Sequence, residues 1–117
     1  MDEPLLAPMR AACTPDADFT RETLPVLAAA LERSSLLIGN DSGLVHIAQA
    51  VGARPLAIFG PTSPRRWGPR APGKAVSLGL SCAPCTNHGS RTCPLGHHDC
   101  IQKLDVSRVL EEALALL

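Results

Sequence analysis

A short polar stretch, Asn40-Asp41-Ser42-Gly43, lies between an apolar run and a helical pattern, and its residue types suit a phosphate-bearing ligand. A helix beginning after Gly43 would present unpaired N–H groups and the positive end of its dipole, and Ser42 would add a hydroxyl donor. Gly43 lets a phosphate approach the backbone. Asp41 would repel a phosphate, so we expect it to accept hydrogen bonds from neighbouring sugar hydroxyls. An ordinary turn, with Asp41 as the helix N-cap, is the alternative that the local sequence leaves open.

His46 follows within the first turns of the same predicted helix. At about 100° per residue it falls opposite the apolar positions Leu44, Ile47, Ala48 and Val51, so it is not expected in the core. As an imidazolium it would pair with a phosphate at the start of the helix. An exposed histidine without a ligand is the simpler alternative.

A second polar loop contains Gly60-Pro61-Thr62-Ser63 and follows the next apolar run, Leu56 to Phe59. Ligands of open α/β sheets bind at the carboxyl ends of the strands, which is where both polar loops are expected. Thr62 could donate to a phosphate, although a rigid proline-rich surface loop explains the same residues. The spacings of a serine-hydrolase elbow, a P-loop and a dinucleotide fingerprint are all absent.

Four cysteines form a separate cluster with the spacing Cys82-x2-Cys85-x7-Cys93-x6-Cys100. One CxxC pair with two further cysteines could enclose a tetrahedral zinc ion in a segment that lacks its own core. The second pair is spaced too widely for a zinc ribbon, so buried or redox-sensitive thiols are the alternative.

The elements that would position these residues alternate between helix and strand. Residues 1–19 are weakly specified, with a short helix around Leu5 to Ala12. An amphipathic helix is expected to begin between residues 20 and 24 and to end near Ser34, with Pro25 in its first turn. Strands buried on both faces are expected at 36–38 and 56–59, with a helix between them and a further short strand at 75–78. Residues 60–74 are expected to form a loop and residues 81–102 to be irregular. The chain is expected to end in a helix capped by Asp105 or Ser107. The apolar stripe of this helix would consist of Val106, Val109, Leu110, Ala113, Leu114 and Leu117.

The composition limits the function classes. Eleven basic and eleven acidic residues give a formal charge of zero, and only three aromatic side chains are present, so nucleic-acid binding is not expected. A start without basic residues and the absence of a long apolar run predict a cytoplasmic protein. Too few strands are expected for a complete doubly wound domain, so the chain is interpreted as part of one.

The stretches LLIGNDSGLVHIAQAVGARPLAIFGPTSPRRWGP and CAPCTNHGSRTCPLGHHDCIQKL together resemble the carboxyl-terminal half of glycosyltransferase family 9, the ADP-heptose:lipopolysaccharide heptosyltransferases, and most closely their heptosyltransferase II type. The resemblance implies a GT-B fold, with residues 20–117 as a truncated nucleotide-sugar-binding domain made of a partial Rossmann-like sheet. It implies donor binding by Asp41, Ser42, Gly43, Leu44, His46 and Thr62.

In that family the lipid-linked acceptor and the catalytic Asp base belong to an amino-terminal domain, which has no counterpart in this sequence. The resemblance therefore implies inverting transfer of heptose from ADP-heptose to the lipopolysaccharide inner core, without a required cofactor, by a complete enzyme at the inner face of the inner membrane. No catalytic residue is assigned within the 117 residues. A non-enzymatic, zinc-stabilised assembly module is the alternative function.

Overall fold

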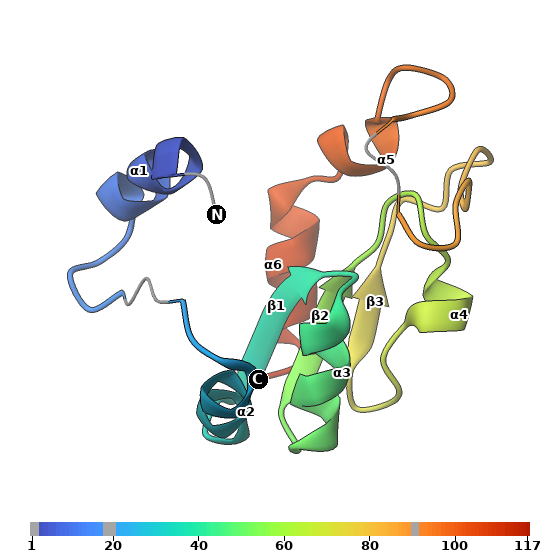
Figure 1. Cartoon of the computed structure of the whole chain (residues 1–117). Coiled ribbons are helices and arrows are strands. Elements are labelled where there is room, and N and C mark those ends of the chain that lie inside the picture. The colour runs from blue at the N-terminus through green and yellow to red at the C-terminus, as the bar shows by residue number, and fades with distance from the viewer. Residues whose placement is uncertain (1–2, 18–20, 90–91) are drawn as a thin grey trace.

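The computed structural model describes residues 3–17, 21–89 and 92–117, and these form an α/β fold around one parallel sheet (Figure 1). Its strands are β1 (Leu36–Asn40), β2 (Arg54–Ile58) and β3 (Lys74–Val76), in the order β1-β2-β3. Both strand pairs are parallel, with Ile38 opposite Leu56 and Ile58 opposite Val76. The predicted α/β class and parallel sheet are confirmed.

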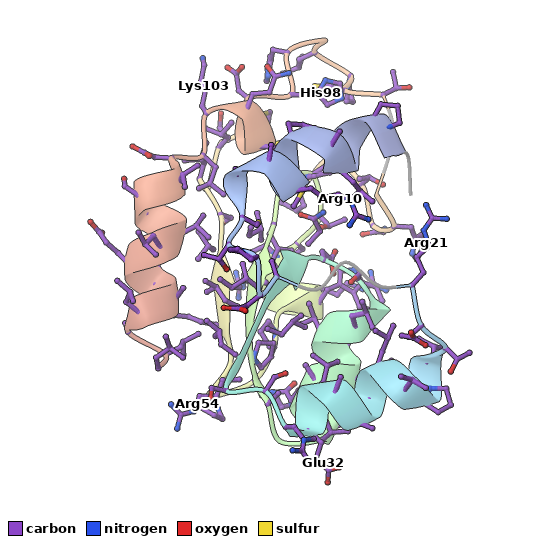
Figure 2. All side chains as sticks on the ribbon, turned by 90° about the vertical axis from the view of Figure 1, so that its left-hand side faces the viewer. Arg10, Arg21, Glu32, Arg54, His98 and Lys103 are labelled. Atoms are coloured by element: carbon purple, nitrogen blue, oxygen red, sulfur yellow. The ribbon has the colours of Figure 1, made fainter. Side chains whose placement is uncertain are left out.

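Helices lie on both faces of the sheet. The described residues form helices α1 (Glu3–Ala12), α2 (Leu24–Glu32), α3 (Gly43–Ala50), α4 (Pro64–Trp67), α5 (Asp99–Gln102) and α6 (Val106–Leu114), of which α3 and α6 make the main contacts with the strands. Figure 1 shows α3 in front of the sheet and α6 behind it, and the side view in Figure 2 places them on opposite sides. Helix α2 packs chiefly against α3. In the described parts of the chain, no helix has the length and apolar character needed to cross a bilayer.

Two small cores occupy the two faces because successive side chains of a strand point in opposite directions. Ala57 and Phe59 pack with Val45 of α3 on one face. Leu56 and Val76 pack with Ala113 of α6 on the other face. The central strand β2 is therefore buried on both sides, as its apolar run predicted.

Strand β1 differs from its prediction of burial on both faces. Ile38 is 49% exposed, because β1 is an edge of the three-stranded sheet and α6 packs against β3 at the opposite edge. The predicted apolar stripe of α6 is divided for the same reason. Val109 and Ala113 face the sheet, whereas Val106, Leu110, Leu114 and Leu117 are exposed.

The segments expected to be irregular contain two short helices. Helix α4 lies in the predicted 60–74 loop, where Ser63 is an extended N-cap and Pro64 occupies the first helical turn that suits its fixed φ. Helix α5 lies at the end of the 81–102 segment. The helix predicted near residues 5–12 is confirmed as α1, whereas the proposed division at residues 19 and 20 lies outside the described residues.

Candidate functional site

The amino terminus of α3 lies at the carboxyl end of β1, as the strand-turn-helix pattern predicted. Ser42 is the N-cap, with φ −154° and ψ 167°, so the alternative in which Asp41 caps the helix is wrong. Ser42 makes no side-chain capping hydrogen bond, although its carbonyl accepts from the Val45 amide at 3.1 Å. The first turn of α3 is therefore not occupied by a capping side chain and retains donors suited to an anion.

Helix α3 holds its polar and apolar residues on opposite sides. Val45 is 1% exposed and Ala48 fully buried, whereas His46 is exposed, which confirms its outward position. The sequence did not place Val45 on the buried face. It is buried because α3 contacts both the sheet and α2, so that its apolar surface is wider than one stripe.

Two neighbouring pockets open at this edge of the sheet. The first, which we call the α3 pocket, has a volume of about 240 Å³ and is lined by Asp41, Ser42, Gly43, His46, Trp67, Asn87 and His88. The second, the strand-end pocket, has a volume of about 260 Å³ and is lined by Asn40, Asp41, Ile58, Gly60, Pro61, Thr62, His88, Gly89 and Ile101. Asp41 and His88 line both, so the two pockets adjoin at these side chains.

The structure brings most of the predicted donor-binding residues together. Asp41, Ser42, Gly43 and His46 share the α3 pocket, and Thr62 shares the strand-end pocket with Asp41. Thr62 is only 6% exposed, so this residue lies at the base of its loop rather than at the surface. Leu44 lines neither pocket, so any contact with a ligand there would come from its backbone amide.

Three lining residues of the α3 pocket were not predicted from the sequence: Trp67, Asn87 and His88. The indole Nε1 of Trp67 donates to the Asn87 carbonyl at 3.0 Å, and the Trp67 and His88 ring centroids are 6.3 Å apart. No short-range pattern links residues 20 positions apart. The sequence signal that could have indicated Trp67 is that it is one of only three aromatic residues and lies beside a polar loop at a strand end.

The arrangement suits a ligand that combines an anion with hydroxyl groups. Main-chain N–H groups and the Ser42 hydroxyl are donors, and His46 and His88 can carry positive charge. The Asp41 carboxylate is an acceptor beside them. A diphosphate joined to a sugar presents the complementary groups in adjacent positions.

The four clustered cysteines line a small pocket of about 50 Å³ with His97. Backbone N–H groups, that of His98 above all, lower the pKa of the Cys93 thiol, whereas burial raises the pKa of Cys100. All five cysteines are free thiols, and across residues 3–17, 21–89 and 92–117 no group of three or more His, Cys, Asp or Glu side chains could hold a metal ion. The zinc prediction for Cys82, Cys85, Cys93 and Cys100 thus has no support from this geometry.

Comparison with known proteins identifies a family match that covers the residues of this site. Residues 19–97 match the family model described as glycosyltransferase family 9 (heptosyltransferase). The chain belongs to glycosyltransferase family 9. The matched residues of this family 9 chain include β1, α3, β2 and every predicted donor-binding position, as well as Trp67, Asn87 and His88.

Two curated relatives show the same affiliation. The family 9 chain is 36% identical over 99 residues to a protein named lipooligosaccharide heptosyltransferase 2 from Campylobacter jejuni serotype O:2, covering 83% of this chain and 30% of the relative. It is 37% identical over 94 residues to the protein of that name from serotype O:6, covering 79% and 29%. The chain thus spans about 30% of the length of these relatives. No solved structure matches it.

Proposed function

We propose that this family 9 chain forms the donor-binding part of a heptosyltransferase. The donor is ADP-heptose, and the complete enzyme transfers the heptose with inversion to the lipopolysaccharide inner core. The proposal extends to the fold, in which the described sheet belongs to the second Rossmann-like domain of a GT-B enzyme. It places the complete enzyme in the cytoplasm, at the inner face of the inner membrane.

The observation that carries the proposal is that Asp41, Ser42, Gly43 and His46 line one pocket at a helix start whose N-cap, Ser42, makes no side-chain capping hydrogen bond. A diphosphate bound there would accept hydrogen bonds from the first turn of α3 and from Ser42. The same contacts would stabilise the negative charge that develops on the leaving diphosphate during transfer.

The strand-end pocket is proposed to hold the sugar. Asp41 lies at its junction with the α3 pocket and would accept hydrogen bonds from heptose hydroxyls, while Thr62 lies along the floor. An anionic carboxylate is suited to hydroxyl donors and not to the phosphates themselves. We assign no catalytic base to the described residues, and the acceptor is proposed to be held by a part of the enzyme outside them.

Calorimetric titration of the 117-residue chain with ADP-heptose, ADP and adenosine tests this proposal. We expect ADP-heptose and ADP to bind and adenosine to bind at least tenfold more weakly, because adenosine lacks the anion. His46→Gln should weaken the binding of ADP and leave the binding of adenosine unaffected, since the glutamine amide keeps a hydrogen-bond donor but cannot carry a positive charge. Equal affinity for ADP and adenosine, or no binding of ADP at millimolar concentration, would overturn the proposal.

The zinc-stabilised assembly module is not favoured. The family match describes a transferase, and the described cysteines are not arranged as a metal site.

A further inference from the structure

A short loop of the cysteine-rich segment, residues 85–89, is fixed against the donor site by hydrogen bonds from two directions. The amides of Cys85 and Thr86 both donate to the Pro61 carbonyl, at 2.9 and 3.2 Å. Pro61 belongs to the loop after β2 that contains Thr62. The 85–89 loop is therefore joined directly to the wall of the strand-end pocket.

The second attachment comes from α4. Trp67 Nε1 donates to the Asn87 carbonyl at 3.0 Å, and the Arg66 guanidinium lies 5.0 Å from the centre of the Trp67 ring. The indole N–H is thus used within the protein, and the ring is engaged by a neighbouring cation. We interpret Trp67 as a positioning residue for the loop rather than as a ligand-binding group.

Hydrogen bonds within the loop define where His88 lies. The Thr86 hydroxyl accepts from the His88 amide at 3.4 Å and donates to the Gly89 carbonyl at 3.3 Å. Gly89 has φ +79°, a conformation that side-chain-bearing residues rarely adopt. This turn leaves the His88 side chain exposed at the junction of the two pockets.

The charge of the site adds a separate reason to consider His88. Among the described residues, neither pocket is lined by a lysine or an arginine, and both are lined by Asp41. A diphosphate bound there would need cationic side chains to offset its charge. The imidazoles of His46 and His88 are the lining side chains that become cationic when protonated, and they come from two different elements.

We propose that His88 binds the diphosphate of the nucleotide-sugar donor, so that the 85–89 loop forms a wall of the donor site. This inference rests on the proposed function and deepens it by assigning a second histidine to the leaving group. The imidazole would donate an N–H hydrogen bond to a phosphate oxygen where the diphosphate meets the sugar. Its position between the two pockets distinguishes it from His46, which lines only the α3 pocket.

The test compares ADP and adenosine binding to the wild-type chain, His88→Ala and His88→Gln by calorimetry. We expect His88→Ala to weaken the affinity for ADP roughly tenfold. His88→Gln should weaken this affinity less, because the glutamine amide keeps a hydrogen-bond donor although it cannot carry a positive charge. The matched control is His98→Asn, in the same segment. His98 lines neither pocket, and asparagine tolerates its left-handed backbone, φ 55°. We expect this control to bind ADP as the wild type does.

The outcomes separate this inference from the proposed function. If the wild type binds ADP and His88→Ala binds it equally well, the assignment of His88 is wrong while the proposed donor site stands. If the wild type binds no ADP, both are overturned. Because a variant could lose affinity by unfolding, amide spectra of each variant are recorded, and an ADP-induced shift of the His88 amide in the wild type is an independent expected result.

Discussion

The Asp41 amide donates to the Ile58 carbonyl across the parallel pair β1–β2, with an N···O distance of 3.2 Å. This bond continues the ladder one residue beyond the end of β1, so the backbone of Asp41 is fixed to β2. The Asp41 side chain consequently starts from a defined point beside the loop that contains Thr62. Asp41 lines both pockets, and this bond fixes the backbone from which its side chain extends.

Asp41→Asn should affect the sugar and the diphosphate differently. We expect ADP-heptose binding to weaken roughly tenfold, because asparagine is a weaker acceptor for sugar hydroxyls than a carboxylate. ADP alone should bind equally well or slightly better, because a negative charge beside the diphosphate is removed. Calorimetry with both ligands measures the two effects. An equal loss for both would show that Asp41 acts through the structure of the site, and Asp16→Asn, in an exposed turn, is the control.

Trp67→Phe should loosen the 85–89 loop without removing the aromatic packing of the half-buried ring. The lost Nε1 hydrogen bond to Asn87 should lower the free energy of unfolding by about 0.5–1.5 kcal/mol. Urea unfolding measures this change in the free energy of unfolding. Circular dichroism is used to follow it because Trp67 is the sole tryptophan of the sequence, so the variant has no tryptophan fluorescence. Hydrogen exchange at the Thr86 and His88 amides, which donate to the Pro61 carbonyl and the Thr86 hydroxyl, should become faster. Exchange unchanged from the wild type would contradict the role of Trp67 as an anchor.

Burial in the central strand should dominate stability. Leu56 is fully buried and packs with Val76 of β3 and Ala113 of α6, and Leu56→Ala is expected to lower the free energy of unfolding by about 2–5 kcal/mol. Leu24→Ala removes the same atoms from a side chain that is 61% exposed, and it should cost less than about 0.5 kcal/mol. Similar losses for the two variants would be inconsistent with the described core.

Asp105 should make the stability of α6 depend on pH. Hydrogen bonds from the Ser107 amide and hydroxyl lower the pKa of Asp105 below its usual value of 3.8. Because the folded-state pKa is depressed, the stabilisation is present at neutral pH and is lost as pH falls through the folded-state value. Asp105→Ala should therefore have a lower Tm than the wild type at pH 7, and the difference should shrink in acid. A difference independent of pH would contradict this cause.

The cysteine cluster should show unequal thiol reactivity. The pKa of Cys93 is lowered by backbone donors and that of Cys100 is raised by burial, so iodoacetamide should modify Cys93 faster at neutral pH. Mass spectrometry of the modified peptides measures the order, with the exposed Cys13 as an internal reference. If all four clustered cysteines were instead protected equally from iodoacetamide, and a chelator abolished that protection, the result would indicate bound metal.

The sequence predicted the part of the fold governed by local patterns. The apolar runs around Ile38 and Leu56 indicated strands, and the intervening periodicity indicated α3 with an exposed His46. The exposure of Ile38 could not be predicted, because it depends on which strand lies at the sheet edge. Helix α4 had a readable signal in Ser63-Pro64, an N-cap residue before a proline, but the surrounding prolines favoured a loop.

The candidate site was predicted in part for the same reason. Asp41 and His46 are close in sequence and share one helix start, so local spacing was sufficient. His88 reaches the site through the bonds of its loop to Pro61 and Trp67, which are more than 20 positions away along the chain. Such contacts follow from tertiary structure and have no local signature.

The central claim is that a diphosphate binds at the amino-terminal end of α3. The most direct measurement is the change in amide chemical shifts as ADP is added to the isotopically labelled chain, comparing Gly43 in the first turn of α3 with Gly52 just beyond its other end. We predict that the Gly43 amide shifts in a saturable manner while Gly52 stays unchanged, and that adenosine moves neither. A Gly43 amide that does not respond to millimolar ADP, or that responds equally to adenosine, would contradict the account.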